Sequence, residues 1–291
     1  MRRIVFCGCI LLLAVFLLSS CQGRSVYTGV EFGVNYVTHL YTLAEAGFKD
    51  EDYVRRYRDS IPLADRDYLK AHAEYMSFYR KDHGVFAQLL YFIPSYFNMQ
   101  TKKEYEEYFG AWAQAINEKS PSLLMKYYEP FGYKDQLLEM FNLDEDNWEM
   151  VKAVNPIFQR IGEIYINNIE TYQRTIWPEI KPILSKKAKT LNKKIERNLI
   201  PKWEQVTGYK FQRKEYCVIL FYAGASGPSF NNLSLDRNTA FYNTDEGYML
   251  DMISHELGIH ILSPHLNQLI WQFQNEIPRI TDDPSIYGNV S

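Results

Sequence analysis

The sequence lacks a marked charge imbalance, and it lacks internal repeats and low-complexity segments. It carries 32 Lys+Arg against 35 Asp+Glu, for a net charge of -3, so it has no basic excess of the kind that attracts nucleic acid. Hydrophobic residues make up 46% of the chain and charged residues 23%, which excludes a disordered polymer. We therefore expect a globular protein with no nucleic-acid partner.

Long apolar runs are also scarce, and the one at the N-terminus is short. It extends from Ile4 to Leu18 and follows Arg2 and Arg3. At about 15 residues it is too short for a comfortable membrane span. Basic residues, a short apolar run and then small residues are the parts of a secretory signal peptide. We therefore assign residues 1–20 to a cleaved signal and not to a membrane-spanning anchor.

The residues at the end of this run are Leu18, Ser19, Ser20 and Cys21. They resemble the lipobox of bacterial lipoproteins, whose cysteine is lipidated and becomes N-terminal after cleavage. The resemblance implies an exported chain that begins at Cys21 and is held to a membrane of the bacterial cell envelope by lipid. Gln22, in a position where aspartate affects sorting, is similar to the pattern of outer-membrane lipoproteins.

Cysteine is nearly absent from the mature chain. Cys7 and Cys9 leave with the signal and Cys21 takes the lipid, so only Cys217 remains. A single cysteine excludes an intramolecular disulfide. Cys217 lies in an apolar run from residue 216 to 222, where we expect a small buried hydrophobic residue and not a nucleophile.

Residues from about Ser25 to Thr207 show apolar spacing of three and four, which predicts helices. Thr101 and Glu104 form a capping-box pattern that opens one of them. The aromatic residues on one side of that helix should belong to the core: Tyr105, Tyr108, Phe109 and Trp112. Four prolines should each kink or end a helix: Pro156, Pro178, Pro182 and Pro201.

The pattern changes after Gly208. Residues Glu215 to Phe221 predict a buried strand, and Leu233 to Phe241 alternate as a second strand with one wet side. We expect the second strand to lie at the sheet edge and to bind an extended peptide as a further strand.

A second capping-box pattern, from Asn243 to Glu246, predicts the start of a helix. The helix should run to about Leu262 and stop at Pro264. The predicted fold class is thus α+β, with a helical region at 21–205 followed by a strand-strand-helix region at 206–291.

This last helix carries the only motif with evident chemistry, His255, Glu256 and His260. In zinc peptidases two histidines bind the metal from one face of a helix, and the glutamate takes a proton from metal-bound water. The usual spacing places the histidines at i and i+4, about 40° apart, whereas i and i+5 are about 140° apart. A one-residue π-bulge at Gly258 would bring them together.

The arrangement from about Val206 to Ile280 resembles the core of the zincin metallopeptidases, of the glutamate-ligand type. The His-Glu-x-x-x-His spacing is similar to that of dipeptidyl peptidase III, an active zinc enzyme. Uncharacterised bacterial zincin-like lipoproteins with the pattern His-Glu-x-x-His-x-x-x-x-Pro are also similar. In that second alignment Ile259 replaces a ligand and Pro264 matches the proline, so the metal site is broken.

The zincin resemblance implies a set of zinc ligands. His255 and His260 would bind the zinc ion, and Glu276 would be the third ligand, in a segment that resembles the one supplying it in such families. His265 is the alternative third ligand.

The resemblance also implies a mechanism of peptide hydrolysis. Glu256 would act as the base, taking the proton of the zinc-bound water and passing it to the leaving amine. Arg279 or Tyr242 would steady the oxyanion.

Two functions therefore compete. The first is a membrane-anchored, zinc-dependent metallopeptidase acting on peptides. The alternative is a degenerate, zincin-derived lipoprotein that binds a peptide or a glycan in the inherited cleft without catalysis. A structural role in the cell envelope is a third alternative.

Overall fold

The computed structural model describes residues 25–76, 88–131, 134–225, 230–234 and 236–273. Residues 1–20, Cys21, Glu276 and Arg279 lie outside the described residues. The chain divides into two compact units. The larger unit comprises Tyr27–Ile195 and Cys217–Ile253, and the smaller unit comprises the rest of the described chain. The domain limits predicted at residues 20 and 205 stay predictions.

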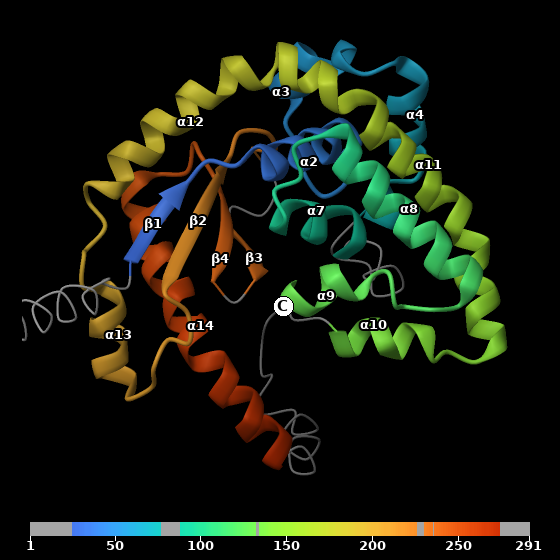
Figure 1. The fold of residues 1–291 in the computed structure, drawn as a ribbon. Helices are drawn as coiled ribbons and strands as arrows, with labels where there is room; N and C mark the ends of the chain where they lie inside the picture. The colour runs from blue at the N-terminus through green and yellow to red at the C-terminus, as the bar shows by residue number, and fades with distance from the viewer. Residues whose placement is uncertain (1–24, 77–87, 132–133, 226–229, 235, 274–291) are drawn as a thin grey trace, which may run out of the picture. The chain divides into compact units, whose positions relative to one another are not determined.

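Helices and strands follow in this order (Figure 1). The first group is β1 (Ser25–Gly29), α2 (Phe32–Leu43), α3 (Glu51–Tyr57), the 3-10 helix η1 (Arg58–Ser60), α4 (Leu63–Ala71), α5 (Ala73–Met76), the π-helix η2 (Gln88–Phe92), α7 (Ile93–Tyr96), α8 (Lys102–Glu118) and α9 (Met125–Phe131). The second group is α10 (Lys134–Phe141), α11 (Glu145–Thr175), α12 (Trp177–Asn192), α13 (Leu199–Thr207), β2 (Glu215–Phe221), β3 (Phe230–Ser234), β4 (Arg237–Phe241) and α14 (Glu246–Phe273).

The predicted α+β class is confirmed. Helices dominate the N-terminal part, and the described strands form one small sheet of four. The strand at Glu215–Phe221 has the predicted bounds, and its side chains from Tyr216 onward are buried. Cys217 within it is buried and takes part in no disulfide among the described residues. None of the helices in the described ranges combines the length and the apolar character that a membrane span requires.

The sheet has the strand order β1-β2-β4-β3 (Figure 1). β4 pairs in parallel with β2 and antiparallel with β3. The prediction of one edge strand from Leu233 to Phe241 is wrong, because these residues are divided between β3 and β4. β4 lies inside the sheet with both sides paired, so it cannot bind a peptide as a further strand.

The start of the predicted helical region is also different, since Ser25–Gly29 forms strand β1. Val26, Tyr27 and Thr28 are β-branched or aromatic residues that favour a strand on a half-buried surface. Their run is too short for helical and strand periodicity to be separated in the sequence.

The core of the larger unit is built around α2, all of whose 12 residues are buried. A helix surrounded on every side needs apolar or hydrogen-bonded residues all round. Tyr36 of this helix lies at its centre, with ring centroids 5.8 Å from Tyr105, 6.0 Å from Tyr165 and 5.2 Å from Tyr172. Many of the 23 tyrosines are therefore core residues.

The capping box at the start of α8 is confirmed, with Thr101 and Glu104 each bonded to the other's backbone. The aromatic side of the helix is buried as predicted: Tyr105, Tyr108, Phe109 and Trp112. It packs along α11 (Figure 1).

The four prolines predicted to kink or end helices occupy two kinds of position. Pro178 and Pro201 lie in the first turns of α12 and α13, where a missing backbone N–H costs little. Pro156 and Pro182 lie inside α11 and α12, so neither ends its helix.

The last helix also continues past its predicted end, because α14 runs through Pro264 to Phe273. A proline inside a helix removes one hydrogen bond but does not prevent the helix when other contacts hold it. At its start, Asp245 caps the helix by accepting a hydrogen bond from the N–H of Tyr248, at 2.9 Å.

Candidate functional site

A cavity of about 250 Å³ opens in the larger unit at the carboxyl ends of β2 and β4. The two strands are parallel, and Phe221 is in register with Phe241, so both end at the same edge. Ligands of open parallel sheets commonly bind outside this edge. Four tyrosines line the cavity: Tyr53, Tyr57, Tyr222 and Tyr242.

The tyrosine rings form a continuous wall. Tyr222 and Tyr242 are stacked, with ring centroids 4.6 Å apart and planes within 15°. The Tyr53 ring lies 6.1 Å from that of Tyr222 and 4.6 Å from that of Tyr57. Such a wall offers flat apolar faces with polar hydroxyl edges.

The stacked pair is fixed by backbone hydrogen bonds. The N–H of Tyr222 donates to Asn35 Oδ1 at 3.0 Å, and the Asn35 amide donates to the carbonyl of Leu220 at 3.0 Å. The N–H of Tyr242 donates to the carbonyl of Phe221 at 3.0 Å. Because Asn35 is buried in α2, the core itself determines where the rings lie.

Asp50 connects two further parts of the wall. One carboxylate oxygen accepts from the N–H of Tyr53 at 2.9 Å, which caps α3. The other accepts from the N–H of Ala225 at 3.2 Å, in the loop after β2. A single carboxylate thus joins the start of α3 to the end of the sheet.

Behind the wall, a chain of hydrogen bonds holds Tyr53. Its hydroxyl is 2.8 Å from His39 Nδ1, and His39 Nε2 is 3.3 Å from Ser60 Oγ. The Ser60 hydroxyl donates to the carbonyl of Tyr57 at 2.5 Å, so His39 donates to Ser60 and accepts from Tyr53. Burial lowers the pKa of His39 to about 3. His39 is therefore neutral and positions Tyr53; it does not activate Ser60 as a nucleophile.

Charged and amide groups surround the aromatic wall: Asp50, Asp52, Arg56 and Asn243. Arg56 forms an ion pair with Glu179 and lies over the Tyr57 ring, 5.3 Å from its centroid. Burial, helped by the hydrogen bond between the Tyr242 and Tyr222 hydroxyls, raises the pKa of Tyr242 to about 12. The Tyr242 hydroxyl is therefore uncharged at neutral pH, and the cavity that it lines also has carboxyl, guanidinium and amide side chains.

The His-Glu motif lies in the part of α14 that belongs to the smaller unit. α14 is a regular α-helix over Glu246–Phe273, without the π-bulge at Gly258 that converging histidines would require. His255 is exposed, whereas His260 is buried with its ring 5.4 Å from that of Tyr216. On a regular helix the two histidines point about 140° apart.

Gly258 has a packing role in this helix. A Cβ atom there would lie 2.7 Å from the ring of Trp203, so only glycine allows the present contact. The Trp203 indole N–H donates to Ser254 Oγ at 3.0 Å, one turn earlier on α14. Gly258 therefore seats the Trp203 ring of α13 against α14 and does not loosen the helix for metal binding.

The described residues do not by themselves assemble a zinc site. His255 and His260 do not converge, and the alternative ligand His265 is stacked on Tyr209 with centroids 3.7 Å apart. In the described parts of the chain, no group of three or more His, Cys, Asp or Glu is placed to hold a metal. Glu276 lies outside them, so the full ligand set and the role of Glu256 as a base stay predictions.

Comparison with protein-family models, with curated proteins and with solved structures gives no match for this chain. The zincin and lipobox resemblances therefore rest on their own residues.

The sequence contained a signal for the tyrosine wall that its analysis missed. Phe-Tyr occurs at the end of β2, as Phe221 and Tyr222, and again at the end of β4, as Phe241 and Tyr242. Two parallel strands that end in the same pair bring the two tyrosines together. Of the four wall tyrosines, the zincin resemblance implies a role for Tyr242 only, as an oxyanion donor, and that role stays a prediction.

Proposed function

We propose that the protein is a lipid-anchored binding protein of the bacterial cell envelope, which holds a glycan in the tyrosine-lined cavity without catalysis. One observation carries the proposal. The stacked Tyr222 and Tyr242 rings lie beside Asp50, Arg56 and Asn243 in a cavity held by buried hydrogen bonds. A pocket of this kind has flat apolar surface with a few polar groups that fix orientation.

The chemistry of the cavity favours a sugar over other ligands. Tyrosine faces suit the C–H surface of a pyranose ring, and carboxylate, guanidinium and amide groups can each bond two neighbouring hydroxyls. The charged lining residues are of both signs, which favours a polar ligand without strong charge. A peptide is less well supported, because β4, which holds most of the strand predicted to bind it, lies inside the sheet.

The zinc metallopeptidase remains a second proposal. Its support is the spacing of His255, Glu256 and His260 and its resemblance to dipeptidyl peptidase III. The regular geometry of α14 favours the binding protein, because a zinc site would require that helix to rearrange.

The binding proposal is tested by screening the chain from residue 22 onward, which contains all described residues, against oligosaccharides and peptides. For the sugar that binds best, Tyr222→Ala and Tyr242→Ala should each weaken affinity about 10- to 100-fold, the loss expected for central aromatic contacts. Isothermal titration calorimetry measures the affinities, and thermal melting checks that each variant is folded.

Tyr248→Ala is the matched control, because Tyr248 is 51% exposed and does not line the cavity. It should leave affinity unchanged. Binding of peptides but not sugars, or equal losses in all three variants, would overturn the proposal.

A further inference from the structure

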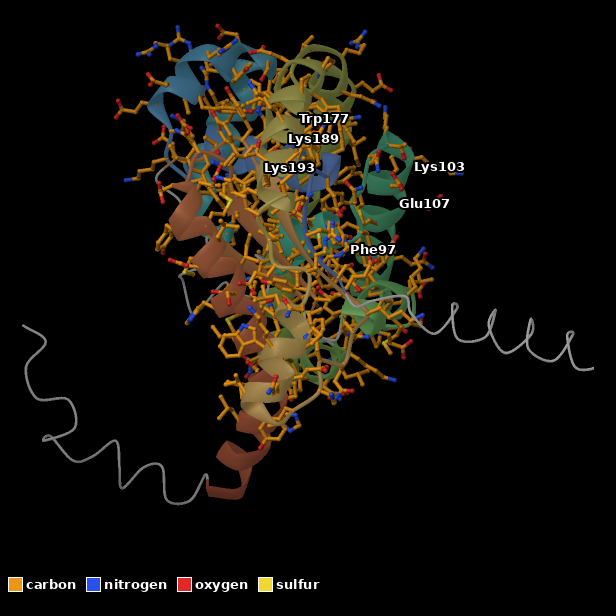
Figure 2. The ribbon with its side chains drawn as sticks, turned by 90° about the vertical axis from the view of Figure 1, so that its left-hand side faces the viewer. Phe97, Lys103, Glu107, Trp177, Lys189 and Lys193 are labelled. Carbon is orange, nitrogen blue, oxygen red and sulfur yellow. The ribbon has the colours of Figure 1, made fainter. Side chains whose placement is uncertain are left out.

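Helix α12 and the residue that caps its C-terminus, Lys193, carry a row of lysines on one face. Lys189 and Lys193 are one turn apart, and Lys186 precedes Lys189 by three positions, so the three lie within about 60° of each other around the helix. All three are exposed. The buried residues Leu184 and Leu191 lie on the opposite side. We call Lys186, Lys189 and Lys193 the lysine face; Figure 2 labels Lys189 and Lys193 along α12.

The lysine face is distinct from the other lysines near this end of α12. Lys187 donates to the carbonyl of Thr244 at 3.4 Å, and Lys194 forms an ion pair with Glu246. Among the described residues, by contrast, no carboxylate is in ion-pair contact with a lysine of the face. The only acidic residue of α12 is Glu179, which Arg56 and Tyr57 already bind. The lysine face thus keeps its positive charge available to an outside partner.

The lysine face lies beside the strand that follows the predicted lipid site. The N–H of Thr28 donates to Asn192 Oδ1 at 2.7 Å, and its hydroxyl donates to the carbonyl of Ala188 at 3.1 Å. The Asn192 amide in turn donates to the carbonyl of Thr28 at 2.9 Å. Thr28 is seven residues from Cys21, so the chain between them spans at most about 25 Å. A lipid on Cys21 keeps this end of α12 close to the bilayer.

We propose that the lysine face binds the headgroups of anionic phospholipids in the membrane that holds the lipid anchor. This inference rests on the anchoring at Cys21, which is part of the proposed function, but not on the glycan site. The chain as a whole is acidic, with a net charge of -3, so a general attraction to an anionic surface is excluded. Contact through this one face would set how the larger unit stands on the membrane.

Each lysine at an anionic surface strengthens binding about fivefold, so the face is worth on the order of 100-fold. The test uses the chain from residue 22 onward, without lipid, and vesicles of phosphatidylcholine with about one third phosphatidylglycerol. We expect it to sediment with these vesicles at low salt and not with pure phosphatidylcholine. Raising NaCl to about 0.5 M should release it, because salt screens exposed charges.

The variant with Lys186→Gln, Lys189→Gln and Lys193→Gln should lose at least tenfold in vesicle affinity, in keeping with the value for each lysine. A matched control removes three other surface lysines, all paired with glutamates of their own helices: Lys102, Lys103 and Lys152. It has the same net charge and should bind within about twofold of the wild-type chain, because its charges were already paired.

Three results would overturn the proposal. The first is a wild-type chain that ignores anionic vesicles, and the second is an equal loss in both triple variants. The third is lysine-dependent binding to dextran sulfate without binding to vesicles, which would identify a polyanionic polysaccharide as the partner. Lipid anchoring is measured separately, as incorporation of labelled palmitate into the full chain, which Cys21→Ser should abolish. A failure of the lysine face to bind lipid can thus be distinguished from a failure of the proposed anchoring at Cys21.

Discussion

The tyrosine-lined cavity and the His-Glu helix differ in how the sequence encodes them. The helix motif lies within six consecutive residues, from His255 to His260, whereas the cavity combines α3 with the ends of β2 and β4. In the helix, the period of 3.6 residues alone decides where the side chains point. In the cavity, the register of Phe221 with Phe241 decides where the side chains of Tyr222 and Tyr242 lie. A motif that is short in sequence is therefore easy to find and can still fail to converge in space.

The two regions also differ in how firmly the structure holds their side chains. Tyr53 is buried and bonded to His39, and Asn35 fixes the backbone of Tyr222. His255 is exposed on the surface of α14. Binding sites need side chains in fixed positions before the ligand arrives, which favours the cavity.

The largest expected effect tests how firmly the structure holds the cavity. We expect the protein to lose stability in mild acid because of His39, the buried support of Tyr53. Burial lowers its pKa from 6.5 to about 3, so below pH 6.5 the unfolded chain takes up a proton that the folded chain refuses. Stability is complete above pH 6.5 and falls by about 1.4 kcal/mol per pH unit below it, until about pH 3. Between pH 6.5 and 4.5 His39 should thus account for a loss of about 2.5 kcal/mol.

Urea unfolding at several pH values, followed by circular dichroism, measures this slope. His39→Gln, which cannot take up the proton, should show a free energy of unfolding that varies less over the same range. If both proteins lose stability in parallel, His39 is not the neutral, buried support of Tyr53 that the structure indicates.

Much of the fold could be predicted, because the signals were local. The strand at Glu215–Phe221 and the capped start of α8 at Thr101 each follow from a few neighbouring residues. The division of β3 from β4, and the interior place of β4, could not be predicted, since strand pairing depends on residues far apart. Pro264 likewise ends a helix only where tertiary contacts do not hold it.

Less of the candidate site could be predicted. The sequence indicated His255 and His260 as metal ligands that would need a bulge at Gly258 to converge. It could not show that Gly258 faces the Trp203 ring. Tyr53 and Tyr222 carried no motif of their own. The repeated Phe-Tyr pair becomes informative only when the two strands are known to be parallel and adjacent.

A smaller effect separates the two histidines of the motif. His260→Ala should lower the free energy of unfolding by about 1–2 kcal/mol, because it empties a buried site against Tyr216. His255→Ala should change it by less than about 0.5 kcal/mol, as is usual for an exposed residue. Urea unfolding measures both, and zinc content is measured on the same samples. If the wild-type chain holds close to one zinc and both variants lose it, the His-Glu helix and not the cavity would be the better supported site, and the metallopeptidase would become the favoured function.

The smallest expected effect is the change in the free energy of unfolding caused by Gly258→Ala, and the sign of this change is informative. On helix propensity alone, Gly258→Ala should stabilise α14 by about 1 kcal/mol. The added Cβ atom would lie 2.7 Å from the Trp203 ring, so the ring must move away from Ser254 and we expect a net loss of about 1 kcal/mol. In the Trp203→Ala background the obstacle is gone, and the same substitution should become stabilising.

Urea unfolding of the two single variants and the double variant gives this reversal as a coupling energy. A stabilising effect in both backgrounds would mean that Gly258 does not seat Trp203. The glycine would then be free for the local distortion that converging histidines require, and the His-Glu helix would again be comparable with the cavity as a site. A reversal of sign would assign Gly258 to the contact between α13 and α14, leaving the motif no flexible point at which to form the metal site.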